Sequence, residues 1–417
     1  MELKPGYKLT EVGVIPNDWD VQSLEEIADP KRPICYGIVQ VGPFVRNGIP
    51  VLAIKNLNVD YFASIHRTSH DIEAPYARSR VRPGDVLISV KGTTGRVGIV
   101  PANFDGNISR DIARLRLTDD DVPAFWFHLL QSDTGQREMG LATVGTTRME
   151  LSIGILKHVR MPRPPKQEQR AIAGALSDVD ALIGALDQLL AKKRDLKQAA
   201  MQQLLTGQTR LPGFHGEWDV STLGQTCSFE NGDRSSNYPS PGSFRQSGIP
   251  FINAGQVAEG QISSSEMNYI TQEAYGRLGG GKVKAGDILF CLRGSLGKFG
   301  VVSSNFGHGA IASSLVIIRP KKPAVSREYL SCYFSSALCA QMIETWSGGA
   351  AQPNLGAKDL ARFSISLPPS LREQTAIAEV LSDMDAELAA LEQKRDKTRL
   401  LKQGMMQELL TGRTRLI

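Results

Sequence analysis

The sequence Pro164-Pro-Lys-Gln-Glu-Gln-Arg-Ala-Ile-Ala173 opens a stretch that occurs twice in this chain of 417 residues. The second copy opens as Pro368-Pro-Ser-Leu-Arg-Glu-Gln-Thr-Ala-Ile-Ala378. With a constant offset of 205 residues, the copies align without a gap from Glu168 and Glu373 to Arg210 and Arg415. Gap-free similarity over such a length indicates an internal duplication.

Each copy is predicted to form one long helix. Two prolines precede it, and proline is tolerated before or at the first turn of a helix but not inside it. Apolar residues then recur at alternating spacings of four and three, which makes a seam that repeats every seven residues. The seam residues are Ile172, Leu176, Val179, Ile183, Leu186 and Leu190, and then Ile377, Leu381, Met384, Leu388 and Leu391. Gly207 and Gly412 follow, where a helix is expected to stop.

The predicted helices are longer than a globular core requires. A helix from Glu168 to Leu205 would be roughly 55–60 Å long. Its apolar seam must be covered, and the other copy is the obvious cover. We expect an antiparallel pair, because the intervening residues can carry the chain back. Two unrelated surface helices are the alternative, and the gap-free similarity argues against it.

A block of mixed character precedes each helix, and the two blocks are weakly similar. The stretch 84–100, Gly-Asp-Val-Leu-Ile-Ser-Val-Lys-Gly-Thr-Thr-Gly-Arg-Val-Gly-Ile-Val, corresponds to 286–302, Gly-Asp-Ile-Leu-Phe-Cys-Leu-Arg-Gly-Ser-Leu-Gly-Lys-Phe-Gly-Val-Val. Each stretch predicts two strands joined by a glycine-rich turn. Residues 125–130 and 329–334 are predicted to form buried helical segments.

The duplication sets the expected architecture. We divide the chain into a first block (1–162), a first long helix (163–211), a second block (212–367) and a second long helix (368–417). The expected fold class is α+β, with two similar mixed α/β domains separated by two long helices that form an antiparallel coiled coil. This is a pseudo-twofold internal repeat, and we expect the two chain termini to lie near each other.

Composition bounds the class of protein. No apolar run is long enough to span a membrane, and the start of the chain lacks an apolar signal region, so we expect a cytoplasmic protein. The five cysteines show no paired metal or redox spacing. The formal net charge of +5 permits a nucleic-acid partner without requiring one.

Basic residues gather around the same hairpin in both blocks. Residues 76–96 contain five basic residues and one acidic residue, and residues 277–298 contain the same numbers. Basic side chains among Gly, Ser and Thr suit contacts with phosphate groups. An ordinary solvated hairpin is the alternative interpretation of each copy.

No catalytic or metal-binding motif stands out. The spacing Gly92-x-x-Gly95-x-x-Gly98 lacks the lysine of a phosphate-binding loop and does not open a helix, so a turn between strands is the better interpretation. His66 and His70 are four residues apart, but nothing near them completes a metal site. We therefore expect a binding subunit without a catalytic or metal site.

The chain resembles the specificity subunits of type I restriction-modification systems. The resemblance rests on the Pro-Pro-x-x-Glu-Gln type of helix opening, on the endings Leu-Leu-Thr-Gly at 204–207 and 409–412, and on the Gly-Asp-hydrophobic strands. The segment Glu-Val-Gly-Val-Ile-Pro-Asn-Asp-Trp at 11–19 is also typical. The resemblance covers the whole chain in the family's order, and only the combination of motifs is specific.

The resemblance implies a role in DNA recognition. Each block would be a target recognition domain that reads one half of a split, asymmetric site in double-stranded DNA, and the coiled coil would set the spacing. Two methyltransferase (modification) subunits would dock on this chain, and restriction subunits, ATP-dependent translocases and nucleases, would complete the complex. S-adenosylmethionine, ATP and Mg²⁺ would be used by those partners, and this chain would bind no cofactor.

Candidate DNA-binding residues follow from the hairpins and from polar residues in the dissimilar loops. The hairpin candidates are Lys91, Thr93, Thr94, Arg96, Arg293, Ser295 and Lys298. The loop candidates are Arg32, Lys55, Arg148, Arg234, Arg245, Gln352 and Asn354. Arginine pairs naturally with guanine, and Asn or Gln with adenine.

The outer helix faces and the helix ends near Gln169, Gln198, Gln374 and Gln403 are candidate docking surfaces for methyltransferase subunits, and ordinary solvated surface is the alternative. A long-helix protein scaffold without a DNA role is the alternative function for the whole chain.

Overall fold

The computed structural model describes residues 4–57, 64–143, 150–258, 260–321, 323–347 and 354–416. The chain forms two compact units. Unit 1 comprises Met1–Asp187 and Gln393–Ile417, and unit 2 comprises Gln188–Glu392. Each unit thus contains one mixed domain and one half of each long helix.

The two long helices form as predicted. α5 spans Lys166–Thr206 and α11 spans Leu371–Leu409. With its 41 residues, α5 is about 60 Å long. Gly207 and Gly412 follow the helices with φ of 72° and 70°, the left-handed conformation in which glycine commonly ends a helix. In the described part of the chain, no helix is apolar and long enough to cross a membrane.

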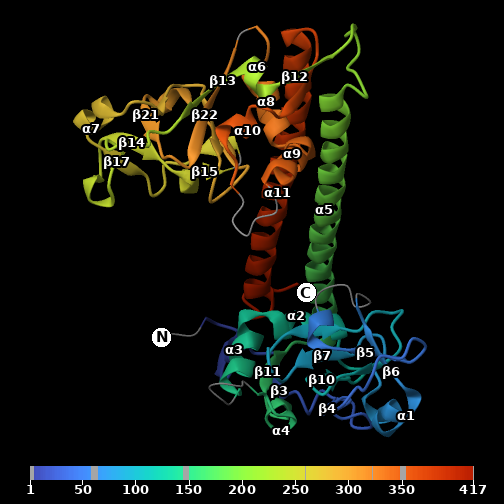
Figure 1. The fold of residues 1–417 in the computed structure, drawn as a ribbon. Helices are drawn as coiled ribbons and strands as arrows, with labels where there is room; N and C mark the ends of the chain where they lie inside the picture. Colours follow the sequence, from blue (N-terminus) through green and yellow to red (C-terminus); the bar gives the residue numbers. More distant parts are fainter. Residues whose placement is uncertain are drawn as a thin grey trace. The chain divides into compact units, whose positions relative to one another are not determined.

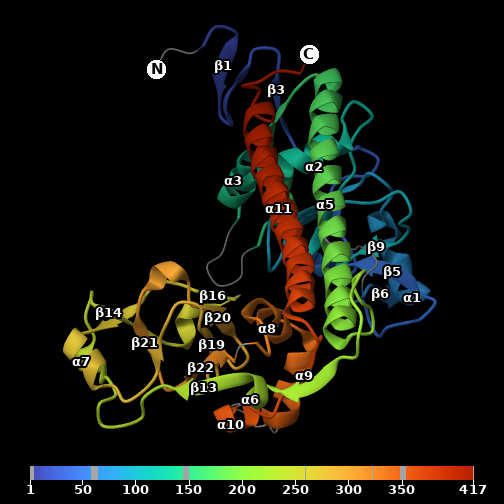
Figure 2. The same ribbon diagram turned by 90° about the horizontal axis from the view of Figure 1, so that it is seen from above.

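The helices lie side by side and run antiparallel in each unit (Figures 1 and 2). In unit 1, Lys402 near the end of α11 forms an ion pair with Asp180 near the start of α5, at 2.7 Å. In unit 2, Lys197 near the end of α5 forms the equivalent ion pair with Asp385 near the start of α11. These pairs, related by the offset of 205, confirm the predicted antiparallel coiled coil.

Unit 1 contains three small sheets and a separate hairpin. The sheets have the strand orders β4-β10-β7-β8, β6-β5-β9 and β11-β3, and the hairpin is β1-β2. The strands are β1 (Tyr7–Thr10), β2 (Gly13–Pro16), β3 (Asp20–Ser23), β4 (Cys35–Tyr36), β5 (Ile49–Leu52), β6 (His66–Thr68), β7 (Val86–Ser89), β8 (Val97–Ile99), β9 (Asn107–Ile108), β10 (Ile112–Leu115) and β11 (Arg160–Arg163). The helices besides α5 and α11 are α1 (His70–Glu73), α2 (Pro123–Gln131), α3 (Asp133–Leu141) and α4 (Ile153–Lys157), with 3-10 turns η1 (Ile54–Asn56) and η2 (Ala74–Ser79).

Unit 2 repeats this plan with additions. Its sheets have the orders β13-β22-β19-β20-β16-β15, β17-β14-β21-β18 and β12-β23. The strands are β12 (Asp219–Thr222), β13 (Cys227–Asn231), β14 (Ile249–Ile252), β15 (Val257–Ala258), β16 (Gly260–Ile262), β17 (Asn268–Ile270), β18 (Lys282–Val283), β19 (Ile288–Cys291), β20 (Phe299–Val301), β21 (Gly309–Ile311), β22 (Leu315–Pro320) and β23 (Ser364–Leu367). The helices are α6 (Leu223–Thr226), α7 (Gln272–Arg277), α8 (Arg327–Phe334), α9 (Ala337–Ser347) and α10 (Ala357–Leu360), with 3-10 turns η3 (Pro241–Ser243), η4 (Ala254–Gln256) and η5 (Ser304–Phe306).

Register confirms the predicted hairpins. β7 pairs antiparallel with β8 so that Val86 faces Ile99, and β19 pairs with β20 so that Ile288 faces Val301. The predicted buried helical segments are α2 and α8, and both pack in the cores. Each core also includes the start of one long helix, through Ile172 in unit 1 and Ile377 in unit 2. The long helices are therefore parts of the domains and not only a connection.

A buried carboxylate fastens the start of each long helix. In unit 1, Glu168 is 0% exposed and receives two hydrogen bonds from Arg415, at 2.6 and 2.9 Å, and one from Trp19 Nε1 at 2.8 Å. In unit 2, Glu373 receives two from Arg210, at 2.9 and 2.6 Å. Each arginine follows the end of the other long helix. The pairs therefore bind the beginning of one helix to the chain leaving the other.

We call each of these buried glutamate–arginine pairs a clamp. The clamp of unit 1 also joins the two ends of the chain. Arg415 also donates to both carboxylate oxygens of Asp18, at 3.0 and 2.6 Å. The Tyr7 hydroxyl donates to the Gly412 carbonyl at 2.9 Å. Figure 2 shows the end of α11 beside β1 and β3. The expectation that the terminal segments lie together is confirmed.

Two glutamines expected on a docking surface are instead buried. Gln169 and Gln374 are 0% and 1% exposed. Gln169 accepts a hydrogen bond from Val122 N and donates to the Pro164 carbonyl. Gln374 accepts from Ser326 N and donates to the Ala324 carbonyl. The prediction was wrong for these two side chains, because both satisfy backbone groups at the contact between a helix start and its domain.

A buried histidine marks the contact between α2 and the helix pair. His128 is 1% exposed, and its Nε2 lies 3.3 Å from Ser177 Oγ. Burial, and then the nearby Lys402 charge, lower the pKa of His128 to about 4, while Asp180 partly opposes them. The side chain is therefore neutral at physiological pH. In unit 2 the corresponding residue is Cys332, whose pKa is raised by burial to about 11.

We predict that Glu168→Gln lowers the free energy of unfolding by about 2–4 kcal/mol, because the buried partner of Arg415 and of Trp19 loses its charge and only the half-exposed Asp18 remains as a carboxylate partner of the arginine. Urea unfolding followed by tryptophan fluorescence measures the change. Asp178→Asn, an exposed position on the same helix, is the control, and we expect it to change little. If both substitutions changed the free energy of unfolding equally, the Glu168–Arg415 pair would not have the proposed stabilising role.

We predict that His128 makes the protein less stable in mild acid. The pKa of the folded state lies below that of the unfolded chain, so between about pH 6.5 and 4 only the unfolded state binds this proton. Stability is therefore lost as the pH falls, by about 3 kcal/mol over that window. Unfolding curves of the wild type and His128→Gln at pH 7 and pH 4 measure this difference. Parallel losses in the two proteins would rule out His128 as the cause.

Candidate nucleic-acid interface

Each basic hairpin is held by an aspartate at its base. In unit 1, Asp85 accepts two hydrogen bonds from Arg116, at 2.8 and 2.6 Å, and one from Arg82 N. In unit 2, Asp287 accepts two from Arg319, at 2.7 and 2.8 Å. The hydrogen bonds to these aspartates raise the pKa of both arginines. The Gly-Asp motif is thus a structural device that fixes the strand leading into the hairpin.

The glycine spacing forms a turn, as predicted. Gly92 and Gly95 have φ of 73° and 81°, and Gly294 and Gly297 have 77° and 86°. Glycine adopts this left-handed conformation without the steric cost that other residues incur. The interpretation of this segment as a turn between strands, and not as a nucleotide loop, is confirmed.

In unit 1 the hairpin side chains lie on the surface. Lys91, Thr93 and Arg96 are exposed and Thr94 is half-buried. Lys91 pairs with Glu150 at 3.0 Å, with about half of each side chain exposed. Exposed ion pairs contribute little to stability, so a DNA phosphate can compete for this lysine. Among the described residues, Arg96 forms no ion pair.

Unit 2 brings two of its candidate arginines together. Arg293 from the hairpin and Arg234 from the segment after β13 both donate to the Ser313 carbonyl, at 3.2 and 3.3 Å. Both side chains are exposed, and no carboxylate of the described chain pairs with either. Leu355 N donates to the Leu292 carbonyl, which places Asn354 next to the start of the hairpin. Two exposed guanidinium groups therefore meet at one carbonyl, and the backbone of Asn354 lies beside the start of the same hairpin.

The equivalent place in unit 1 carries different side chains. Leu151 N donates to the Val90 carbonyl, as Leu355 N does to Leu292. Lys91 and Glu150 of unit 1 thus occupy the positions of Arg293 and Asn354 in unit 2. Glu150 was not among the residues predicted from the sequence, and it directly precedes Leu151, the counterpart of Leu355.

The other candidates are scattered. Lys55 is exposed on η1, while Ser295 and Lys298 lie on the unit 2 hairpin. Arg245 donates to its own neighbours, the carbonyls of Phe244 and Gly242, at 3.0 and 3.4 Å. Arg32 lies in a separate pocket of unit 1. Arg148 and Gln352 lie outside the described residues.

The two histidines do not share an element. His66 lies in β6, where its ring contacts Phe44, and His70 begins α1. Over the described ranges, no group of three His, Cys, Asp or Glu residues is placed to hold a metal ion.

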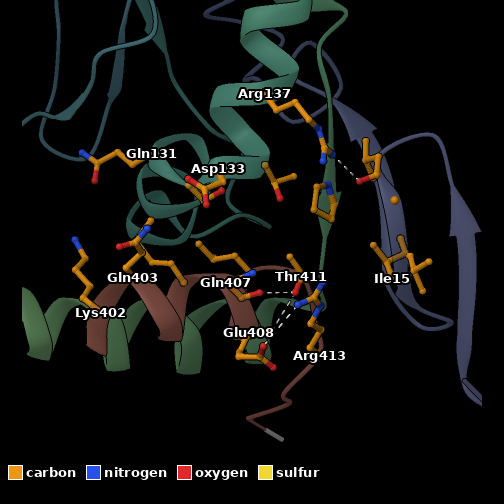
Figure 3. A pocket seen from close by; sticks show the side chains of 18 of the residues that line it. Ile15, Gln131, Asp133, Arg137, Lys402, Gln403, Gln407, Glu408, Thr411 and Arg413 are labelled. Atoms are coloured by element: carbon orange, nitrogen blue, oxygen red, sulfur yellow. Dashed lines mark hydrogen bonds and ion pairs between the residues drawn. The ribbon is translucent and has the colours of Figure 1, made fainter. Parts of the chain in front are cut away.

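A groove lies between a long helix and a helical turn in each unit. In unit 1 its volume is about 1140 Å³, and it is bounded by α11, the start of α3 and the β1–β2 hairpin. Figure 3 shows Lys402, Gln403 and Gln407 of α11 directed toward Gln131 and Asp133. In unit 2 the corresponding groove measures about 480 Å³ and lies between α5 and the α8–α9 turn.

The two grooves match on the side formed by the long helix. The matched pairs on the long helices are Arg399 and Arg194, Lys402 and Lys197, Gln403 and Gln198, Met406 and Met201, and Gln407 and Gln202. The two remaining glutamines of the docking hypothesis, Gln198 and Gln403, are exposed in these grooves.

Comparison with known proteins identifies the family. The family described as "Type I restriction modification DNA specificity domain" matches residues 16–192 and again 215–400. The chain therefore belongs to the type I restriction-modification specificity subunits and carries their DNA recognition domain twice.

Two similar proteins are also specificity subunits of type I restriction enzymes. A chain from Methanocaldococcus jannaschii assigned as the type I restriction enzyme MjaX specificity subunit is 26% identical, covering 98% of this chain and 97% of that one. The type I restriction enzyme EcoBI specificity subunit of Escherichia coli is 29% identical over 47% of this chain and 43% of its own length.

Solved structures share the fold. A type I restriction-modification system structure concerned with complex assembly contains a chain with a TM-score of 0.60 and 19% identity, covering 95% of this chain and 99% of that chain. The S subunit from M. genitalium gives a TM-score of 0.58 and 16% identity, covering 98% and 99%. The predicted fold class is confirmed.

Proposed function

We propose that this specificity subunit reads a split, asymmetric site in double-stranded DNA, with one half contacted by each unit. One observation supports it above the others. The two units hold the same hairpin on the same aspartate–arginine pair but present Lys91 and Glu150 in one and Arg293 and Asn354 in the other. Equal scaffolds with unequal polar side chains are suited to reading two different sequences. The family match favours this function over a scaffold without a DNA role.

Within this proposal the parts have separate tasks. Residues 1–162 and 212–367 act as target recognition domains, and residues 163–211 and 368–417 act as the spacer. The remaining candidate residues supply further phosphate and base contacts. The chain has no catalytic role, and it acts on DNA in the cytoplasm. S-adenosylmethionine, ATP and Mg²⁺ serve the methyltransferase and restriction subunits.

The two matched grooves support docking of two identical partners. A duplicated chain that presents the same long-helix face twice offers one type of partner two similar places. We assign these places to the two methyltransferase subunits. Restriction subunits then join the assembled complex.

We predict that the double variant Arg234→Gln with Arg293→Gln alters recognition of one half-site only. Each arginine contact with a base contributes about 1–3 kcal/mol of discrimination. The measurement is genome-wide mapping of methylated bases after co-expression with the cognate methyltransferase subunit. Arg372→Gln is the control, because Arg372 is exposed in unit 2 and lies outside the hairpin. We expect it to leave both half-sites unchanged.

A domain exchange extends this experiment. Replacing residues 212–367 with the corresponding block of another family member is expected to change one half of the methylated sequence and preserve the other. The chain without its partner is expected to transfer no methyl group. If the methylated sequence stayed the same after both the domain exchange and the arginine substitutions, the proposal that each unit reads one half-site would be refuted.

We predict that Gln403→Arg and Gln198→Arg each remove one methyltransferase subunit from the complex, and that the double variant removes both. A long charged side chain fills part of the groove and introduces a cation beside existing ones. Native mass spectrometry measures the stoichiometry. Leu400→Arg is the control, since Leu400 is 69% exposed on α11 but does not line the groove. Unchanged stoichiometry in the glutamine variants would place docking elsewhere.

A further inference from the structure

An arginine lies inside the unit 1 domain without a carboxylate partner. Arg114 is in the middle of the sheet, on β10, and is only 1% exposed. Its guanidinium donates to four backbone carbonyls, those of Arg78 at 2.7 Å, Pro33 at 3.0 Å, Arg32 at 3.2 Å and Arg80 at 3.3 Å. Its Nε is buried and has no hydrogen-bond partner in the described chain. Burying a cation without an opposite charge is costly, so this arrangement requires an explanation.

The acidic residues nearby are already engaged. Asp85 receives both bonds of Arg116, and Glu25 pairs with Lys157 at 2.8 Å. Asp29 accepts a hydrogen bond from Lys31 N at 2.8 Å. Burial lowers the pKa of Arg114, yet an arginine stays charged at neutral pH. No carboxylate of the described chain hydrogen-bonds to Arg114, and Asp85, whose charge attracts it, is already bound by Arg116.

A pocket of about 300 Å³ opens beside this arginine. Its lining includes Lys31, Arg32, Arg78 and Lys157 together with Arg114, and it contains no carboxylate. Arg114 forms the inner wall, because it lines the pocket although it is almost fully buried. Lys31, Arg32 and Arg78 are exposed, and none of them forms an ion pair within the described ranges. The cavity therefore concentrates positive charge around one buried cation.

Unit 2 shows that the fold itself does not require this arginine. Arg114 lies opposite Leu87 in the sheet, and the residue opposite the equivalent Leu289 is Ile317. The strand neighbour of Arg114 is Cys35, whereas that of Ile317 is Glu230, which binds Arg319. The same sheet thus forms around an aliphatic side chain. Of the two equivalent positions, only the one in unit 1, Arg114, carries a buried cation.

We propose that this pocket binds a phosphate group. The Nε–H of Arg114 has no acceptor in the described chain. The lysine and arginine side chains that line the pocket are charge-assisted donors of the kind that phosphate oxygens prefer. A bound anion supplies the missing opposite charge. The phosphate belongs either to a small free anion or to the backbone of DNA contacted by unit 1. Only the second source depends on the proposed DNA-reading function.

The first test uses the full chain and inorganic phosphate. Equilibrium dialysis with radiolabelled phosphate at low salt is expected to show one site per chain. The wall variant Lys31→Gln with Arg78→Gln is expected to bind about tenfold to a hundredfold more weakly, because two charge-assisted donors are removed. Arg46→Gln, an exposed arginine of unit 1 outside the pocket, is expected to bind normally. Arg114→Ile copies the residue of unit 2 and is expected to abolish binding, and the wall variant still tests the site if Arg114→Ile does not fold.

The second test distinguishes the sources. Affinity for duplex DNA is measured against salt concentration for the wild type and the wall variant. If the phosphate belongs to DNA, the slope of log K against log salt becomes shallower in the wall variant, by about one for each DNA phosphate that the variant no longer neutralises. An unchanged slope with stoichiometric binding of inorganic phosphate assigns the pocket to a free anion. The inference would be overturned if inorganic phosphate did not bind stoichiometrically and the slope was the same in the wild type and the wall variant.

Discussion

The clamp between a buried glutamate and an arginine at the far end of the repeat holds each unit together. Glu168 is withdrawn from water at the start of α5, and Arg415 lies beyond the end of α11. Glu373 and Arg210 repeat the arrangement in unit 2. A buried carboxylate is tolerated only when its charge and lone pairs are satisfied. The clamp therefore commits the start of each long helix to the segment that leaves the other, which is the antiparallel arrangement.

The clamp and the hairpin bases separate stability from recognition. Asp85 and Asp287 are almost fully buried and hold their arginines in both units. The exposed side chains around them are then free to differ while the frame stays intact. Lys91 has a carboxylate neighbour, whereas Arg293 stands beside a second arginine. A duplicated frame with unequal surface chemistry is what a reader of two different half-sites requires.

Sequence patterns predicted the regular elements well and the contacts poorly. Heptad spacing and the preceding prolines located α5 and α11, because helix formation and seam burial depend on residues a few positions apart. Glycine-bounded strand patterns located both hairpins for the same reason. The sequence did not reveal that Gln169 and Gln374 are buried, because their partners are backbone groups of the preceding domains. Likewise, Glu168 meets Arg415 across 247 residues, and no local pattern indicates such a pair.

The sequence alone determined the duplication, the two long helices, the paired hairpins and the family, since each of these depends on residue order and short-range spacing. The tertiary structure decided which charges are neutralised and which remain available. It placed Arg234 and Arg293 at one carbonyl, and it buried Arg114 in unit 1 where Ile317 stands in unit 2. The strength of a charge depends on its neighbours and on its exposure to water, and both are set by residues that only folding brings together.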